Sequence, residues 1–199
     1  MLHFEKLTHG FGSKTLFSSV TMTLKAPKIV LTGPNGSGKT TLLLLAAGLI
    51  KPQSGKVTFQ NQTVLTSTIK SQIGISANKI ALPEFFTTKE QIQFHCAMHQ
   101  CGYPEQLIAQ FSLHPFLNTK IDDLSLGNYK KLSLLCAIMH SPKLLLLDEP
   151  NNGLDEKTNA ALMAYLTQFK GQVIIASHDE SMLKGCKVYD IADFKQVKT

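Results

Sequence analysis

Hydrophobic and polar positions along the chain follow two patterns that predict two kinds of strand. Segments that are apolar at every position are typical of parallel strands buried on both faces of a sheet. These segments are residues 29–31 of a strand 29–32, residues 144–147 and residues 173–176. Segments that alternate polar and apolar side chains are typical of half-exposed antiparallel strands. These are residues 2–7, 20–24 and 57–59, and further strands are expected at 72–76 and 188–191.

Helical stretches lie between these strands and fill the middle of the chain. They are residues 40–47, 89–99, 104–111, 125–139 and 155–169. Strands that alternate with helices predict an α/β fold. We expect a single domain over residues 1–199, with an α/β core at about 1–78 and 141–199. The mostly helical part, at about 79–140, would form a subdomain inserted into that core.

A glycine-rich turn joins the apolar strand at 29–32 to the helix at 40–47. Its residues are Gly33, Pro34, Asn35, Gly36, Ser37, Gly38, Lys39 and Thr40, which match GxxxxGK[ST] in the strand-to-helix context that this motif requires. The glycines let backbone N–H groups turn toward phosphate oxygens, and the helix N-terminus adds positive potential. Lys39 can reach the outer phosphates, and the Thr40 hydroxyl can hold Mg²⁺.

Two acidic residues, Asp148 and Glu149, follow the buried strand at 144–147. The carboxyl ends of such strands are where α/β folds place ligands. Asp148 could therefore bind Mg²⁺, directly or through water, and Glu149 could polarise an attacking water as a general base. A solvated acidic turn is the alternative for this pair alone, and the preceding phosphate loop favours the catalytic interpretation.

Two further segments carry polar groups that could face a phosphate. Ser125 can cap the helix at 125–139, and Gly127 leaves backbone accessible at that helix N-terminus. His178 follows the strand at 173–176 and could hydrogen-bond a terminal phosphate or the region of Glu149. Capped helices and loop histidines are common, so each segment is a weak signal by itself.

One histidine pair also suggests a metal. His95 and His99 lie four residues apart and would share one face of a helix. No second ligand group lies nearby in the sequence, so we expect soft side chains here rather than a metal site. The cysteines form no CxxC pair and fit reduced thiols; they are Cys96, Cys101, Cys136 and Cys186.

Composition narrows the classes of partner. The formal net charge is +6, and every basic residue is a lysine. Without arginine the chain lacks the two-pronged contact that specific nucleic-acid binders favour, so we expect no nucleic-acid partner.

The longest apolar run, near residues 40–50, is far shorter than the roughly 20 residues of a spanning helix. The first residues show no secretory pattern, so we expect the chain to stay in the cytosol.

Taken in this order, these segments resemble the ATP-binding domain of ABC (ATP-binding cassette) proteins. The matching parts are the loop 33–40, the signature Leu124-Ser125-Leu126-Gly127-Asn128, the strand 144–148 with Glu149, the segment 151–155, and His178. The signature separates this family from other phosphate-loop ATPases. The resemblance covers essentially the whole chain. It implies a phosphate-loop NTPase core with a mostly parallel sheet, an N-terminal antiparallel β-subdomain and a helical insert.

The resemblance also implies roles for single residues. ATP would bind the loop residues and Thr41, with Phe11 stacked on adenine. In a head-to-tail dimer, the signature residues Ser125, Leu126, Gly127 and Asn128 would contact ATP held by the partner, and Asp155 would contact the partner. Lys39, Glu149 and His178 would be catalytic, and Thr40, Asp148 and Asn78 would hold Mg²⁺.

The chain departs from the family pattern at several positions. Leu126 stands where the family usually has glycine, and Asn128 stands where it has glutamine. Asn78 takes the place of the loop glutamine with an amide one methylene shorter, which puts its role in doubt. Lys130 and Lys131 replace arginines that commonly follow the signature.

The resemblance implies an ATP-binding and ATP-hydrolysing subunit of a membrane ABC transporter, with ATP and Mg²⁺ as cofactors. It would be peripheral at the cytoplasmic face of the inner membrane, in a homodimer or heterodimer bound to separate integral membrane subunits. Residues 82–86 would offer a docking groove, although Phe85 and Phe86 could equally be core. Length and the compact insert resemble the haem exporter ATPase of cytochrome c maturation. A drug- or peptide-type exporter ATPase, a soluble non-transport ABC ATPase and a partner that binds nucleotide without hydrolysis are the alternatives.

Overall fold

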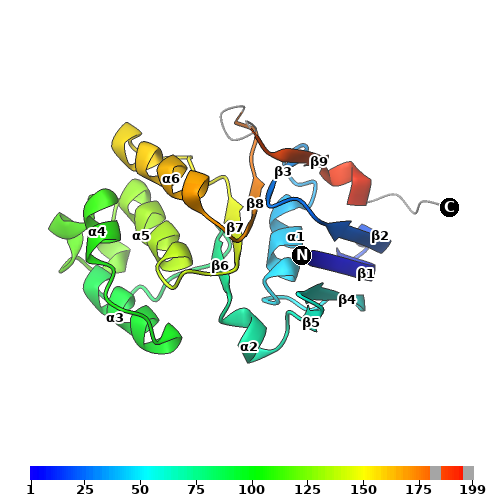
Figure 1. Cartoon of the computed structure of the whole chain (residues 1–199), viewed down its shortest axis with the longest axis horizontal. Coiled ribbons are helices and arrows are strands. Elements are labelled where there is room, and N and C mark those ends of the chain that lie inside the picture. Colours follow the sequence, from blue (N-terminus) through cyan, green and yellow to red (C-terminus); the bar gives the residue numbers. More distant parts are fainter. Residues whose placement is uncertain (180–184, 195–199) are drawn as a thin grey trace.

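Two sheets and a helical insert follow one another along the long axis of the computed structural model, which describes residues 1–179 and 185–194 (Figure 1). The antiparallel sheet has the strand order β2-β1-β4-β5. Its strands are β1 Leu2–Phe11, β2 Lys14–Leu24, β4 Ser54–Phe59 and β5 Gln62–Thr63. β1 and β2 extend beyond the predicted strands because Gly12, with φ 55°, allows a tight hairpin that pairs Phe11 with Lys14.

The second sheet is parallel in every pairing and has the order β6-β7-β8-β3-β9. Its strands are β3 Lys28–Thr32, β6 Ile73–Ser76, β7 Leu144–Asp148, β8 Gln172–Ala176 and β9 Lys187–Asp190. β7 and β8 are buried at every position, which confirms the interpretation of the solidly apolar segments. The mostly parallel core sheet and the N-terminal antiparallel sheet are both as expected.

The helices cover the parallel sheet on both faces. They are α1 Lys39–Ala46, α2 Ser67–Lys70, α3 Thr88–His99, α4 Glu105–Gln110, α5 Leu126–Ile138 and α6 Glu156–Gln168. Helix α1 lies between the two sheets, whereas α5 and α6 lie on the opposite face, with α3 and α4 beyond them (Figure 1). Short helix α2 and strand β5 were not expected, since four and two residues are too few to give a periodic signal.

Two apolar clusters fill the spaces between these layers. One joins the antiparallel sheet, α1 and one face of the parallel sheet, and the other joins the opposite face to α3–α6. Neighbouring residues of β3 point to different clusters, Leu31 to the first and Val30 to the second, as the strand period requires. Phe85 is 75% exposed, so the interpretation of Phe85 as core is wrong, while Phe86 is half-buried.

Candidate active site

The parallel strands β3, β6, β7 and β8 all end at the same edge of their sheet. A pocket of about 390 Å³ opens there. It brings together Phe11, the loop residues 35–40, Thr41, Asn78, Asp148 and Glu149. Residues that are far apart in the sequence therefore share one pocket, as their places at strand ends predicted.

Gly33, Gly36 and Gly38 of the phosphate loop all have positive φ angles, and the first and last show why glycine is needed. Gly33 has a φ of 130°, and a Cβ there would lie 2.5 Å from Ile191 Cγ2. Gly38, the N-cap of α1, has a φ of 113°. L-amino acids with side chains rarely adopt such angles, so glycine is the residue that lets the loop wrap the helix N-terminus. The result is a cradle of backbone N–H groups that suits an anionic ligand.

Lys39 lies across this loop. Its side chain is buried, and its ammonium donates to the carbonyl oxygens of Gly33, at 2.7 Å, and Pro34, at 3.2 Å. The same nitrogen lies 3.1 Å from Nε2 of His178. These contacts fix a positive charge at the mouth of the loop, where it can meet phosphate oxygens.

Thr40 and Asp148 form the next contact in the pocket. The Thr40 hydroxyl donates to Oδ2 of Asp148 at 2.6 Å, and the carboxylate is almost fully buried. Lys130 of α5 donates to the backbone carbonyl of Asp148 at 2.9 Å. Burial lowers the pKa of Lys130, while the carboxylates of Asp148 and Glu149 act in the opposite direction. Nothing in the sequence pointed to this contact except the place of Lys130 after the signature.

Glu149 has a left-handed backbone, with φ 44°, which is uncommon for a residue with a side chain. Its N–H donates to the Ala176 carbonyl at 2.8 Å, and its carboxylate accepts from the Ser177 hydroxyl at 3.4 Å. The other carboxylate oxygen lies 3.7 Å from Nε2 of His178. Backbone strain of this kind clusters at functional sites, where the surrounding contacts hold it in place. The structure thus brings Glu149 and His178 together.

Phe11 forms one wall of the pocket. It is 54% exposed, so it is not a core residue. The His9 ring meets it edge-on, with ring centroids 5.1 Å apart, and the Lys79 ammonium lies 5.9 Å from its centroid. Lys14 and Lys79, which also line the pocket, were missed because neither lies in a motif. Their places beside the hairpin turn and directly after Asn78 were the available signals.

The signature is not part of this pocket's lining. Ser125 caps α5 by accepting from the Asn128 N–H at 3.3 Å, as predicted, and Leu126 is 90% exposed. Gly127 packs so closely that a Cβ would lie 2.9 Å from the Gly153 carbonyl oxygen. The chain therefore presents a second helix N-terminus, apart from the phosphate loop, with an exposed side chain beside it.

Asp155 stabilises the start of α6 within its own chain. It caps α6 by accepting from the Thr158 N–H at 2.8 Å, and it forms an ion pair with Lys131. The Lys131 contact, followed by the Thr158 N–H, holds the pKa of Asp155 well below its usual range. Through Lys131 and Gly127, the start of α5 is tied to the segment that follows Glu149.

The sequence profile of the ABC transporter family matches residues 17–152, which include the loop, the signature and the acidic pair. This chain belongs to the ABC transporter family of ATP-binding domains. Members of this family bind ATP, and the pocket described above lies at the position of the phosphate loop.

Curated relatives place the chain among ABC proteins of several kinds. It is 38% identical over 165 residues to the uncharacterized ABC transporter ATP-binding protein YdbJ of Bacillus subtilis (strain 168), covering 78% of this chain and 52% of that protein. The chain thus spans about half the length of this relative. It is 31% identical to the cytochrome c biogenesis ATP-binding export protein CcmA of Novosphingobium aromaticivorans, covering 92% of both chains.

Among solved structures, the dimeric post-hydrolysis state of the ATP-binding cassette MJ0796, bound to ADP and Pi, superposes with a TM-score of 0.83. The match covers 100% of this chain and 97% of that chain at 22% sequence identity. This similarity shows that the two chains share the ABC ATPase fold.

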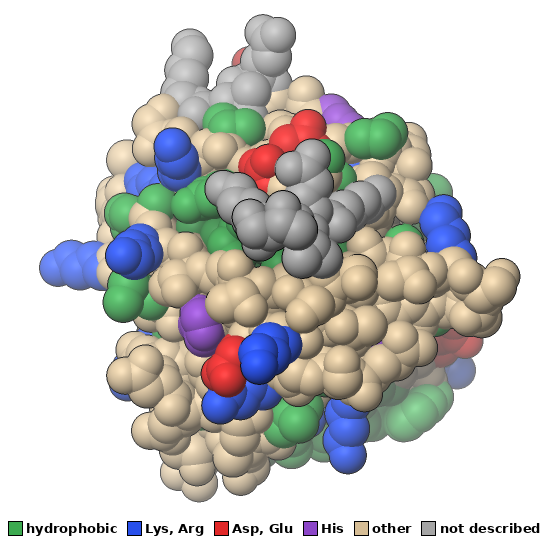
Figure 2. Space-filling view, turned by 90° about the vertical axis from the view of Figure 1, so that its right-hand side faces the viewer, with side chains coloured by type: hydrophobic (Ala, Val, Ile, Leu, Met, Phe, Trp, Pro, Cys, Tyr) green, Lys and Arg blue, Asp and Glu red, His purple; other side chains and the backbone are tan. Residues whose placement is uncertain are grey.

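Two further observations on this ABC domain concern membrane-spanning helices and surface charge. Within residues 1–179 and 185–194, no helix has the length and apolar character needed to cross a bilayer. On the face shown in Figure 2, lysine side chains are dispersed rather than gathered into one basic patch.

Proposed function

We propose that this chain binds ATP with Mg²⁺ and hydrolyses it as the ATPase subunit of a membrane ABC transporter. The observation that carries the proposal is the pocket at the ends of β3, β7 and β8. There Lys39, Thr40, Asp148 and Glu149 converge, with His178 in contact with Lys39 and Glu149.

The phosphate loop and Lys39 would bind the ATP phosphates. Backbone N–H groups at the start of α1 would donate to phosphate oxygens. Lys39 would exchange its contacts with the two loop carbonyls for contacts with the outer phosphates. Thr41 lies beside the loop, and the exposed ring of Phe11 offers a face on which adenine can stack.

Thr40 and Asp148 would hold Mg²⁺. Their hydroxyl and carboxylate oxygens are the ligands that this hard cation prefers, and they already lie 2.6 Å apart. When bound, the ion neutralises negative charge on the β- and γ-phosphates. Asn78 lines the same pocket and is exposed, so its amide can reach this region directly or through a water.

Glu149 would accept the proton of the attacking water. Its carboxylate contacts Ser177 and His178, and Glu149 lines the pocket. His178 also contacts Lys39, so it can sense whether that lysine has moved onto the phosphates. Replacing Glu149 with Gln keeps the shape and removes the base.

The signature would complete the site of a second ATPase subunit. The Leu126 side chain is apolar and exposed to solvent. Ser125 and Gly127 lie at a helix N-terminus that is outside the nucleotide pocket of its own chain. A head-to-tail dimer would place this N-terminus against the γ-phosphate held by the partner. Asp155 and Lys131, which fix the neighbouring segment, would lie at the same interface.

Membrane subunits would dock on the helical insert. The Phe85 ring is exposed and meets the Phe86 ring at 4.7 Å, and Phe86 meets Phe94 at 5.7 Å. Such an exposed aromatic cluster is a typical protein contact surface. The chain would then act at the cytoplasmic face of the membrane. The similarity to CcmA over 92% of both chains supports a haem-exporter-like complex for this chain.

Copurification tests the transporter assignment. The Glu149→Gln chain, tagged in its native host and supplied with ATP, should remain in a closed complex after gentle detergent extraction. Multi-spanning membrane proteins in stable proportion are the expected result, and their identity gives the substrate class. Recovery of ribosomes, DNA or the chain alone would overturn the transporter assignment in favour of a soluble ATPase.

An ATPase assay on the purified chain tests the catalytic assignment separately. Glu149→Gln should lower the turnover number by at least about 100-fold while ATP still binds. Glu84→Gln, which removes an exposed carboxylate outside the pocket, is the matched control and should keep full activity. Unchanged turnover in Glu149→Gln would remove Glu149 from the mechanism.

A further inference from the structure

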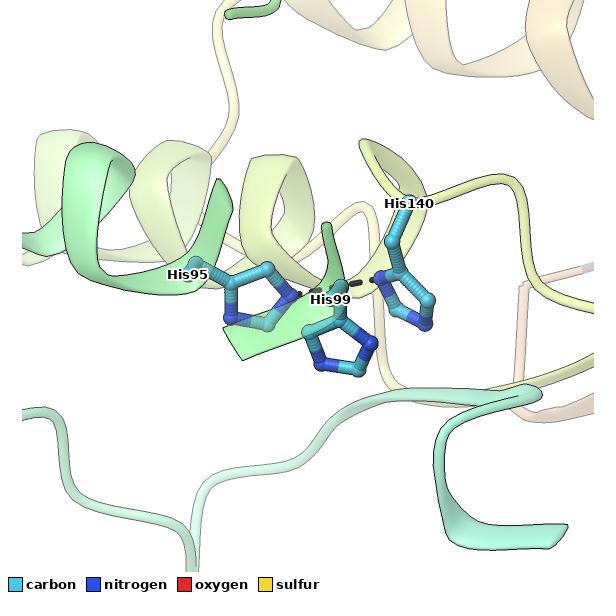
Figure 3. Close-up of side chains that lie close together, drawn as sticks. All are labelled: His95, His99 and His140. Atoms are coloured by element: carbon cyan, nitrogen blue, oxygen red, sulfur yellow. Dashed lines mark hydrogen bonds between the residues drawn. The ribbon is translucent and has the colours of Figure 1, made fainter. Parts of the chain in front are cut away.

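Three histidine side chains gather in a groove outside the nucleotide pocket (Figure 3). His95 and His99 lie one turn apart on α3, and His140 follows α5. The His99 ring stacks on both others, with centroids 4.4 Å from His95 and 4.0 Å from His140. One nitrogen of each ring lies within 4.8 Å of the other two. No further ligand lies near His95 and His99 in the sequence, but the fold brings His140 beside them from 41 residues beyond His99.

The spacing of the nitrogens suits a tetrahedral metal. Two nitrogens that each lie 2.0–2.1 Å from a tetrahedral ion are about 3.3 Å apart. Nε2 of His95 and Nδ1 of His140 lie 3.2 Å apart. His99 is partly exposed on the same face of α3, so a side-chain rotation can bring its nitrogen to the third position. The ion would replace the hydrogen bond between His95 and His140.

The residues that line the groove around these rings determine which metal ions can bind. It has a volume of about 300 Å³, and none of the described residues that line it is a carboxylate. Its other lining side chains are mostly apolar, with Lys70 at one side. Three imidazoles without an oxygen ligand disfavour Mg²⁺ and Ca²⁺, which need several oxygens. Borderline ions such as Zn²⁺ suit this set.

The state and orientation of the rings also suit a metal. Burial, followed by the neighbouring rings, lowers the pKa of His95 and of His140 to about 4, so both are neutral and keep a free lone pair near pH 7. The contact between Nε2 of His95 and Nδ1 of His140, at 3.2 Å, directs one nitrogen of each ring toward the other. An ion placed between these two nitrogens would therefore meet ligands that already face it.

Two buried polar atoms in the groove lack partners among the described residues. They are Nε2 of His140 and Oε1 of Gln91, which lies one turn before His95 on α3. Buried polar atoms are nearly always satisfied by protein, water or a ligand. Their presence in one groove indicates that water or another polar ligand belongs there. With the ion on Nδ1 of His140, Nε2 would carry the ring proton and could donate it to such a water.

We propose that His95, His99 and His140 bind one Zn²⁺ ion, with the fourth tetrahedral position open to water or an external ligand. The ligands come from α3 and from the end of α5, so the ion would join these two helices. Metal binding would therefore stabilise α3 against the end of α5 within the helical insert.

Isothermal titration of the purified chain with Zn²⁺ tests the proposal. The chain carries no polyhistidine tag, and excess Mg²⁺ is present to occupy the pocket at Thr40 and Asp148. One Zn²⁺ per chain should bind. His99→Ala and His140→Gln should each weaken this binding by at least about 100-fold, since even loss of an orienting contact costs 10–100-fold. His114→Ala, which removes an exposed histidine paired with Glu105, should bind as the unmodified chain does.

Co²⁺ gives a second measurement that needs no variant. The unmodified chain should show the intense visible absorption of tetrahedral Co²⁺, and Zn²⁺ should abolish it by displacement. A weak octahedral spectrum would overturn the proposal. So would Zn²⁺ binding that survives loss of His99 or His140, or that His114→Ala removes equally.

Discussion

Substitution of Gly74 by alanine should destabilise the chain strongly. Gly74 lies in β6, against the end of α5. A Cβ at this position would lie 1.9 Å from the Ala137 carbonyl oxygen, whereas a Cβ essentially never approaches another atom closer than 3.0 Å. The obstacle is helix backbone rather than a flexible side chain. Strand and helix must therefore separate by about 1.1 Å inside a buried interface, and the other contacts between them are loosened.

The size of the effect follows from the cost of overpacking. Atoms inserted into a packed core typically lower the free energy of unfolding by about 1–3 kcal/mol. A clash with backbone belongs at the upper end of this range, so we expect a loss of about 3 kcal/mol. For a chain of this size, 1 kcal/mol shifts the melting temperature by about 2–4 °C. Gly74→Ala should therefore lower the melting temperature by about 6–12 °C.

Thermal unfolding followed by circular dichroism measures this shift. Gly102→Ala is the matched control, because a Cβ there meets nothing within 4 Å. It should leave the melting temperature unchanged or raise it slightly, since alanine restricts the unfolded chain. Equal melting temperatures for Gly74→Ala and Gly102→Ala would refute the described packing of β6 on α5.

Three further predictions concern other parts of the molecule. Phe11→Ala should raise the dissociation constant for ATP by about 5- to 100-fold through lost stacking, measured by nucleotide titration, and Phe85→Ala should not change it. The contact with Lys131 lowers the pKa of Asp155, so its contribution to stability is present at neutral pH and is lost as the pH falls below about 4. Urea unfolding should thus show Asp155→Asn less stable than the unmodified chain at pH 7, with the difference shrinking in acid. Burial raises the pKa of Cys136 to about 12, and mass spectrometry should find it unalkylated by iodoacetamide at pH 8 until the chain is unfolded.

The sequence predicted the parts of the fold that local pattern controls. Solid apolar runs at 144–147 and 173–176 identified β7 and β8, because strands buried on both faces are apolar at nearly every position. The motif and the acidic pair located the pocket, since strand ends in a parallel sheet meet at one edge. Ser125 was predicted as a cap from its place before a helix, and the Asn128 contact confirms it.

Features that depend on long-range packing were missed. His140 joins His95 and His99 only because α5 ends beside α3, and no local pattern encodes that approach. The exposure of Phe85 could not be predicted either, since two consecutive aromatic residues are interpreted as core when their neighbours in space are unknown. Lys130 illustrates the same limit, because its contact with the Asp148 carbonyl crosses from helix to strand.

Complementation between two inactive variants tests the central claim most directly. Lys39→Ala removes the lysine from the phosphate loop. Ser125→Asp keeps a good helix cap but places a carboxylate where the signature would meet the partner's γ-phosphate. Each variant alone should be inactive, because both sites of its homodimer are damaged.

A mixture of the two variants forms heterodimers in which one site combines both changes and the other has neither. If exchange is random, half of the dimers are mixed, so ATPase activity should recover to about a quarter of that of the unmodified chain. Recovery to that level is the result that a composite ATP site predicts. A mixture as inactive as its parts, in dimers shown to have exchanged, would contradict it.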